Sequence, residues 1–332
     1  MRLLVAGGDR VDAGKTTFAV GLLASTPGEP VAVKPRAGND YWFDHDDALA
    51  ALSEGRLYGK DVTRLVETGS APPNTHSDPT DTHPNTHSDS TDAHPNTHSD
   101  STDTHHNTHR DSTDASHPHE RANPVHRLWR PTPGRTGMLG ERGRTFLVDR
   151  VQTPEGDSFV VNGNVDIPET VRESLPLESA ARVTSVGEFN DVMRERHLPA
   201  LRRLADRLRA DGDDGARRST PGRDGDDHLV VESYADVADP LRGVDYDAVA
   251  VVDPGRCRVY GGHRWNVACA AADDAGGQLE ERVDSVTGMI EPLATVSLPP
   301  LAAAEREDPT AVADANAEAY ERLFEAATER EQ

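Results

Sequence analysis

A glycine-rich segment near the start of the chain has the residue types that bind phosphate. Residues 7–17 read GGDRVDAGKTT, and Gly14, Lys15 and Thr16 stand near the end of the segment. In a phosphate-binding loop, backbone N–H groups surround the phosphate oxygens, the lysine contacts the β- and γ-phosphates and the hydroxyl binds Mg²⁺. The usual loop has four residues between its glycines, whereas five residues separate Gly8 from Gly14. The spacing fits either a chance match or a loop of another length.

The residues on both sides of this segment favour a functional loop. The apolar run Leu3–Ala6 reads as a buried strand, and residues 16–25, with Phe18 and Leu22 on one face, read as a helix. A strand, a loop and a helix in this order aim the loop amides and the helix N-terminus at one ligand. We therefore predict nucleoside triphosphate binding; the alternative, a plain turn without a ligand, does not require Lys-Thr after the second glycine. The predicted nucleotide contacts are Gly8, Asp12, Ala13, Gly14, Lys15, Thr16 and Thr17.

Two more positive charges are predicted to lie beside this loop. The run Val31–Val33 reads as a strand, and Lys34 and Pro35 follow at its carboxyl end. Ligands of α/β sheets bind at that end of the strands, so Lys34 and Arg36 would face the γ-phosphate or an anionic substrate. Asp47 lies at the start of a short helical run, and we predict it either as a Mg²⁺ ligand or as a helix N-cap.

An acidic residue ends a later strand. The apolar run Leu229–Val231 is followed directly by Glu232. A carboxylate at the end of such a strand holds the Mg²⁺ shell or polarises a water molecule, although a solvated strand end would have the same sequence. The predicted catalytic residues are Lys15, Lys34 and Glu232, and the predicted Mg²⁺ ligands are Thr16, Asp47 and Glu232.

The order of these segments resembles that in dethiobiotin synthetases. That family has a loop of the same length, then a strand ending in Lys-Pro, an Asp-Ala-Leu helix start and a strand ending in Val-Val-Glu. Here the segments read GDRVDAGKT, VKP, DALAAL and VVES. By this resemblance Lys15 contacts phosphates, and Thr16, Asp47 and Glu232 surround Mg²⁺. Lys34 would face the acceptor substrate.

The resemblance covers residues 1–60 and 228–300. Residues 38–44, GNDYWFD, are similar to a Gly-x-Asp-Tyr stretch of the cobyrinate synthases, which are relatives of that family. The glycine-rich Glu-Gly-Ala-Gly-Gly of the family reads ESYAD here, at 232–236. The chain resembles at least as well the archaeal proteins described as predicted P-loop ATPases or GTPases, which have no assigned substrate.

The composition argues against several classes of partner. A formal net charge of −23 disfavours nucleic acid and acidic membrane surfaces. Lysine occurs only at positions 15, 34 and 60, and the other basic residues are Arg; this pattern is typical of halophilic archaea, where salt screens acidic repulsion, or of a GC-rich genome. Cys257 and Cys269 form neither a disulfide framework nor a metal pattern. No apolar run reaches the roughly 18 residues of a membrane helix, so we predict a soluble, cytoplasmic protein without a signal peptide.

Two polar segments interrupt the chain. Residues 74–117 repeat with a period of eleven, beginning NTHSDPTDTHP, and have almost no apolar side chains. Such a composition cannot offset the entropy of ordering, so we predict a disordered insertion; loose binding of Zn²⁺ or Ni²⁺ by its His and Asp residues is the alternative. Residues 211–227, DGDDGARRSTPGRDGDD, are predicted to form a flexible loop.

Strand and helix signals alternate along the rest of the chain. The predicted strands are 145–148, 159–161, 228–232, 248–252, 256–260 and 295–298, and the predicted helices are 278–287 and 310–328. An amphipathic segment at 189–208 should kink or split at Pro199. This alternation predicts a single domain over residues 1–332: an α/β P-loop NTPase with a largely parallel sheet flanked by helices.

Three functions fit these observations. The leading hypothesis is a Mg²⁺-dependent ATPase, ligase-like in the manner of dethiobiotin synthetase, that uses the γ-phosphate of ATP to activate a carboxylate or carbamate. A regulatory or metallochaperone-type GTPase switch and a small-molecule kinase are the alternatives. The sequence has no Asn/Thr-Lys-x-Asp motif for guanine, which favours ATP over GTP. The predicted partners are the nucleotide and a small anionic acceptor. A homodimer is predicted only by analogy with other proteins of this fold class.

Overall fold

The computed structural model of the chain describes residues 1–8, 14–72, 117–213, 228–276 and 281–329. Asp12 and Ala13 of the predicted loop lie outside these ranges, as do residues 74–116 of the predicted insertion and 214–227 of the predicted polar loop. Within the described ranges the fold is α/β, as predicted. The predicted parallel pairing is found for β1, β2, β8 and β9, but the strands form two mixed sheets and not the single sheet predicted.

The first sheet is built around the first strand of the chain. Strand β1 lies between β8 and β9 and is parallel to both, and β2 extends the parallel part beyond β8. In spatial order the strands are β11 (Ala294–Ser297), β10 (Arg256–Gly261), β9 (Ala248–Asp253), β1 (Arg2–Gly7), β8 (Leu229–Glu232) and β2 (Val31–Val33). Because β1, β8 and β2 run the same way, their carboxyl ends meet at one edge of the sheet.

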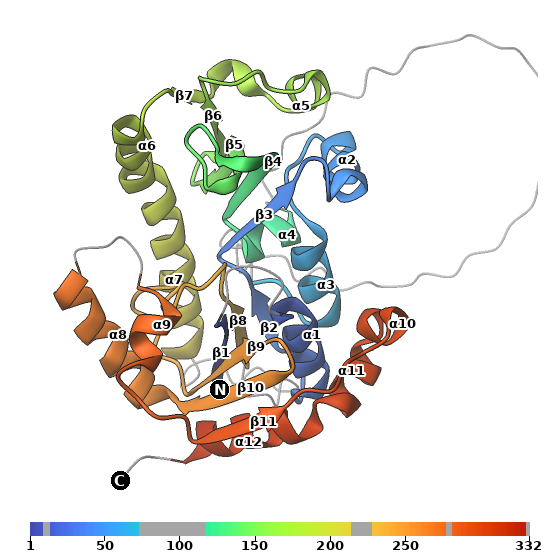
Figure 1. The fold of residues 1–332 in the computed structure, drawn as a ribbon, viewed down its shortest axis with the longest axis vertical. Helices are drawn as coiled ribbons and strands as arrows, with labels where there is room; N and C mark the ends of the chain where they lie inside the picture. Colours follow the sequence, from blue (N-terminus) through green and yellow to red (C-terminus); the bar gives the residue numbers. More distant parts are fainter. Residues whose placement is uncertain (9–13, 73–116, 214–227, 277–280, 330–332) are drawn as a thin grey trace, which may run out of the picture.

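Helices cover both faces of the first sheet (Figure 1). This double cover explains why the strands read as continuous apolar runs and not as alternating ones. One face carries α1 (Lys15–Ser25), α3 (Lys60–Thr68) and α12 (Ala317–Thr328), preceded by α10 (Ala303–Glu307) and α11 (Pro309–Ala315). The other face carries α7 (Leu198–Asp213), α8 (Gly262–Gly276) and α9 (Val283–Thr287).

The second sheet begins where the chain leaves β2. Lys34 and Pro35 join the two sheets directly, because β3 starts at Arg36. In spatial order its strands are β3 (Arg36–Asp40), β4 (Val125–Thr136), β5 (Arg142–Thr153), β6 (Gly156–Asn162) and β7 (Ala181–Val183). One face packs on α2 (His45–Ser53) and α5 (Glu169–Ser174), and the other on α6 (Val186–Val192). The short helix α4 (Pro118–Ala122) precedes β4.

Two helices hold the sheets in a fixed relation. The first turns of α7 pack on the second sheet through Ala200 and Leu201, and the next turns pack on the first sheet through Leu204 and Leu208. Figure 1 shows α7 running beside both sheets. In α3, Val62 packs beside β3 and Leu65 packs against the first sheet. The junction between the sheets is therefore a packed part of the fold.

The predicted break at Pro199 is confirmed, and its form is a π-helix. Residues Met193–His197 form this wider turn between α6 and α7. Proline has no N–H to continue the α-helical pattern, and the N–H of Leu198 donates to the carbonyl of Met193, five residues earlier. The wider turn places His197 at 2.8 Å from Asp149 of β5, where both side chains are buried.

Several predicted boundaries are wrong. The predicted helix at 310–328 is two helices that break at Asn316, whose side chain donates to the carbonyl of Val312. The described part of the predicted helix at 278–287 is helical only in α9. Helix α7 continues to Asp213, inside the predicted loop at 211–227. Across the described ranges, none of the helices is both long and apolar enough to cross a membrane.

A glycine inside α1 allows two later helices to pack closely on it. A Cβ at Gly21 would lie 2.4 Å from the Tyr320 hydroxyl and 2.6 Å from Val312 Cγ1. That hydroxyl donates to the carbonyl of Phe18 at 2.9 Å and so ties α12 to α1. The position of α1, and hence of the residues at its start, depends on this close approach.

We expect Gly21→Ala to lower the free energy of unfolding by up to about 2 kcal/mol. Overpacking costs roughly 1–3 kcal/mol, and the higher helix propensity of Ala offsets about 1 kcal/mol of it. Urea denaturation measures the change. Gly187→Ala in α6 is the control, because the nearest atom to an added Cβ there is 3.9 Å away. Equal stability of the two variants would contradict the close packing at Gly21.

Candidate functional site

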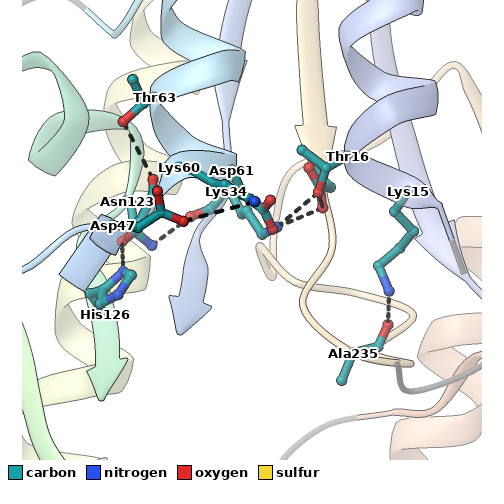
Figure 2. A network of polar contacts seen from close by, with 12 residues as sticks. Lys15, Thr16, Lys34, Asp47, Lys60, Asp61, Thr63, Asn123, His126 and Ala235 are labelled. Carbon is teal, nitrogen blue, oxygen red and sulfur yellow. Dashed lines mark hydrogen bonds and ion pairs between the residues drawn. The ribbon is translucent and has the colours of Figure 1, made fainter. Parts of the chain in front are cut away.

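Four of the predicted site residues lie at the carboxyl edge of the first sheet, and Figure 2 shows three of them, Lys15, Thr16 and Lys34. Lys15 and Thr16 begin α1, Lys34 follows β2 and Glu232 ends β8. The Thr16 hydroxyl donates to Glu232 Oε1 at 2.8 Å. Lys34 Nζ donates to the same oxygen at 2.7 Å and to Thr16 Oγ1 at 3.3 Å. The sequence segments that predicted one site thus meet in three dimensions.

The structure adds Asp61, which the sequence analysis missed. Asp61 lies in the first turn of α3 and accepts a hydrogen bond from Lys34 Nζ at 2.6 Å. The signal was weak, since an acidic residue after Gly59 and Lys60 reads as an ordinary helix start. Only the packing of α3 against the first sheet brings this carboxylate to Lys34.

Asp47 lies outside this cluster. Its carboxylate is 3.9 Å from Lys60 Nζ, and partial burial raises its pKa above the ordinary value. Among the described residues, no hydrogen bond or ion pair joins Asp47 to Thr16, Lys34 or Glu232. The contacts therefore favour Asp61 over Asp47 as the aspartate beside Thr16 and Glu232.

The charges of the cluster are strongly coupled. Burial alone would lower the pKa of Lys34, but the carboxylates of Asp61 and Glu232 outweigh it and raise this pKa above its ordinary value. Burial would likewise raise the pKa of Asp61, but Lys34 outweighs it and lowers this pKa. The pKa of Lys15 is lowered, because burial outweighs the attraction of Glu232. Lys15 is thus a partly buried cation, and the neighbouring carboxylates do not fully compensate the effect of its burial.

Lys15 extends across the edge of the sheet toward the segment after β8 (Figure 2). Its Nζ donates to the carbonyl of Ala235 at 2.8 Å. Ala235 has a left-handed φ of 49°, a conformation that strains an L-residue by roughly 1–2 kcal/mol and that glycine adopts freely. Such strain is found at functional sites.

The glycines of the loop have different structural roles. Gly14 has a φ of 80° directly before α1, which requires glycine. Gly8 has no room for a side chain, because a Cβ would lie 1.9 Å from Asp253 Oδ1, at the end of β9. Thr17 lies in the first turn of α1 and is half-buried. A neighbouring strand thus fixes the position of the first glycine.

The oxygen atoms of the cluster fit Mg²⁺ held jointly with a nucleotide. Glu232 Oε2 is buried and has no hydrogen-bond partner in the protein, and a cation would satisfy it. With Thr16 Oγ1 and the Asp61 carboxylate it gives the oxygen ligands that Mg²⁺ prefers, together with water and phosphate. In the described part of the chain, no group of three or more His, Cys, Asp or Glu could hold a metal ion. The protein alone therefore supplies only part of a shell.

Arg36 lies on the far side of Lys34, in the second sheet. It lines a small cavity with Arg127 of β4, His197 and Tyr234. Arg127 is bound by both oxygens of Asp149, at 2.6 Å each. Apart from Arg36, the sequence analysis missed these residues, because they come from segments that lack a recognisable motif.

Comparison with known proteins does not identify a family for this chain. The chain matches no protein-family model, no curated protein and no solved structure. The residues and their geometry therefore carry the functional argument.

We expect removal of the Lys34 ammonium to destabilise the protein strongly. Lys34→Met should lower the free energy of unfolding by about 3–5 kcal/mol, because it leaves buried Glu232 without its cation. The control Lys60→Met should change it by less than about 0.5 kcal/mol, because this exposed lysine pairs only with Asp47. Urea denaturation measures both. A loss of under 1 kcal/mol for Lys34→Met would contradict a tightly buried ion pair.

Proposed function

We propose that the chain is a Mg²⁺-dependent P-loop NTPase that uses the γ-phosphate of ATP in a ligase-like reaction on a small anionic acceptor. The observation that carries this proposal is the convergence of Lys15, Thr16, Lys34 and Glu232 at the carboxyl ends of three parallel strands. The resemblance to dethiobiotin synthetases and cobyrinate synthases points to the same class. The resemblance includes these residues, and Thr16, Lys34 and Glu232 contact one another.

Each residue has a distinct role in this proposal. Lys15 exchanges the Ala235 carbonyl for phosphate oxygens, and their negative charge compensates the burial of its ammonium group. Thr16, Glu232 and Asp61 hold Mg²⁺; we place Asp61 where the resemblance placed Asp47. When bound, Mg²⁺ neutralises charge on the transferring phosphoryl group.

Lys34 is proposed to orient the acceptor, with Arg36 beside it. Its ammonium stays protonated because Asp61 and Glu232 raise its pKa, so it serves as a fixed positive charge and not as a base. With Mg²⁺ bound by the oxygens of Asp61 and Glu232 that accept from Lys34 in this structure, the donors of Lys34 would be available to an anionic carboxylate or carbamate near the phosphate. The missing guanine motif favours ATP, and GTP remains the alternative nucleotide.

Nucleotide turnover separates this proposal from a GTPase switch and from a small-molecule kinase. A ligase-like enzyme turns over quickly only when its acceptor is present. A switch turns over slowly without an acceptor and responds to a protein partner. A kinase transfers the phosphate to a hydroxyl group, so its product is a stable phosphate ester that ³¹P NMR detects.

Lys15→Ala should abolish nucleotide binding while the fold persists. A half-buried lysine with one hydrogen bond to the protein contributes little to stability, whereas its contact with phosphates is charge-assisted. Calorimetric titration with ATP and with GTP measures the effect, and Lys60→Ala serves as the control lysine. Wild-type affinity for both nucleotides in Lys15→Ala would refute the phosphate-binding assignment.

The metal ligands can be tested by charge-neutral substitutions. Glu232→Gln and Asp61→Asn should each reduce turnover by roughly 10²-fold, comparable to the loss of one preorganised electrostatic contact, and raised Mg²⁺ should restore part of it. Asp47→Asn should have a much smaller effect, because this carboxylate contacts Lys60 instead. Turnover is measured over a range of Mg²⁺ concentrations, and Mn²⁺ affinity by electron paramagnetic resonance.

The opposite result for Asp47 and Asp61 would support the Mg²⁺ ligands that the resemblance to dethiobiotin synthetases implied. If Asp47→Asn weakens Mn²⁺ binding and Asp61→Asn does not, the metal is held as in the family that the chain resembles. If Glu232→Gln has wild-type turnover at limiting Mg²⁺, Glu232 is only the buried partner of Lys34.

A further inference from the structure

The junction of the two sheets contains a small cavity next to the candidate phosphate site. The cavity measures about 50 Å³, enough for several water molecules, each of which needs roughly 10–15 Å³ of cavity volume. Arg36 and Arg127 line it from the second sheet, and Tyr234 lines it from the segment after β8. This volume accepts one small head group and excludes a nucleotide.

The cavity lies close along the chain to the Lys34–Glu232 ion pair. Arg36 comes two residues after Lys34, and Tyr234 comes two residues after Glu232. Two residues of chain span at most roughly 7 Å, so the backbone at Arg36 and at Tyr234 lies within that distance of the backbone of the ion pair. The cavity and the candidate phosphate site are therefore neighbours in the fold.

Tyr234 presents a polar group that the protein leaves unsatisfied. Its hydroxyl is buried and has no hydrogen-bond partner among the described residues. An unmade hydrogen bond of a buried group is unfavourable, so a ligand that accepts this bond gains affinity. The hydroxyl lies near Arg127: burial lowers the pKa of Arg127, but Asp149 and then Tyr234 raise it.

The wall behind the cavity is rigid. Asp149 accepts two hydrogen bonds from Arg127 at 2.6 Å each, and its Oδ2 is 2.8 Å from His197 Nε2. The Arg127 guanidinium also lies 5.0 Å from the centre of the Trp129 ring and 4.9 Å from that of Phe189. Because these contacts neutralise Asp149, the wall presents no uncompensated negative charge to an anion.

Arg36 supplies positive charge to a lining that is partly apolar. Val125 and Met193 contribute aliphatic surface beside the polar groups. A guanidinium fork matches the two oxygens of a carboxylate, and the tyrosine hydroxyl adds a third donor. These three donors match the two oxygens of a carboxylate more closely than the four oxygens of a phosphate dianion.

We infer that this cavity is the recognition subsite for a carboxylate group on a small aliphatic acceptor, bound by Arg36 and Tyr234. The inference names the substrate class of the proposed function and rests on that function for the role of the neighbouring phosphate site. It places recognition of the acceptor mainly in the second sheet, most of which lies outside the segments that resemble dethiobiotin synthetases.

The test uses acetate as the probe and the full chain without nucleotide. Titration with ¹³C-labelled acetate at constant ionic strength, followed by NMR, should give saturable binding. Tyr234→Phe, which removes only the hydroxyl, should weaken binding about tenfold, and Arg36→Gln should weaken it at least as much. The matched controls are Tyr58→Phe, whose exposed hydroxyl donates to Glu54, and Arg322→Gln, whose guanidinium pairs with Glu325 on the surface. Both controls should bind acetate as the wild type does.

Two results would overturn the inference. The first is the absence of saturable acetate binding in the wild type, or equal binding by wild type and Tyr234→Phe. The second is tighter binding of inorganic phosphate than of acetate, with the same dependence on Tyr234, which would identify a phosphate subsite. If Arg36→Gln does not fold, Tyr234→Phe decides the question, because this substitution preserves shape. Since no nucleotide is present, failure here is distinct from failure of the Lys15→Ala test.

Discussion

The burial of one ammonium group between two carboxylates constrains much of this structure. Lys34 is 6% exposed and Glu232 is 1% exposed, and burying such charges is unfavourable unless each one is paired. Pairing requires β2 beside β8, which positions Lys34, and α3 against the same edge, which positions Asp61. The chain crosses into the second sheet directly after Lys34, so the same ion pair fixes where that sheet begins.

A second buried polar network supports the other side of the junction. Asp149 binds Arg127 and His197, and Arg150 of the same strand donates to the carbonyls of Leu57 and Asn123. Polar groups buried in this way rigidify their surroundings when all of them are satisfied. Glu232 Oε2 and the Tyr234 hydroxyl are among the buried side-chain atoms that have no hydrogen-bond partner in the described part of the chain. These two lie where the proposed metal and acceptor would bind.

The features that the sequence predicted are those set by neighbouring residues. The strand before Gly8, the helix after Gly14 and the break at Pro199 depend on local patterns, and the structure confirms all three. Asp61 was missed because its role depends on the packing of α3, not on a motif. The second sheet was missed for a similar reason, since β3 pairs with β4 across the predicted insertion, and sequence periodicity does not reveal long-range pairing. The close approach of Asp253 gives a reason for the glycine at position 8, which the sequence spacing alone did not supply.

The contacts of Lys34 explain why this position has lysine in a chain whose basic residues are mostly arginine. Lys34 Nζ donates to three oxygens that belong to separate elements: Asp61 Oδ2, Glu232 Oε1 and Thr16 Oγ1. An ammonium has three donors arranged around a point, which suits three acceptors converging on one atom, whereas a guanidinium spreads its donors in a flat fork. A chain that otherwise uses Arg almost throughout therefore retains Lys where the acceptors converge on a point. Where the acceptor is a carboxylate that offers both oxygens, as at Asp149, the chain uses Arg127.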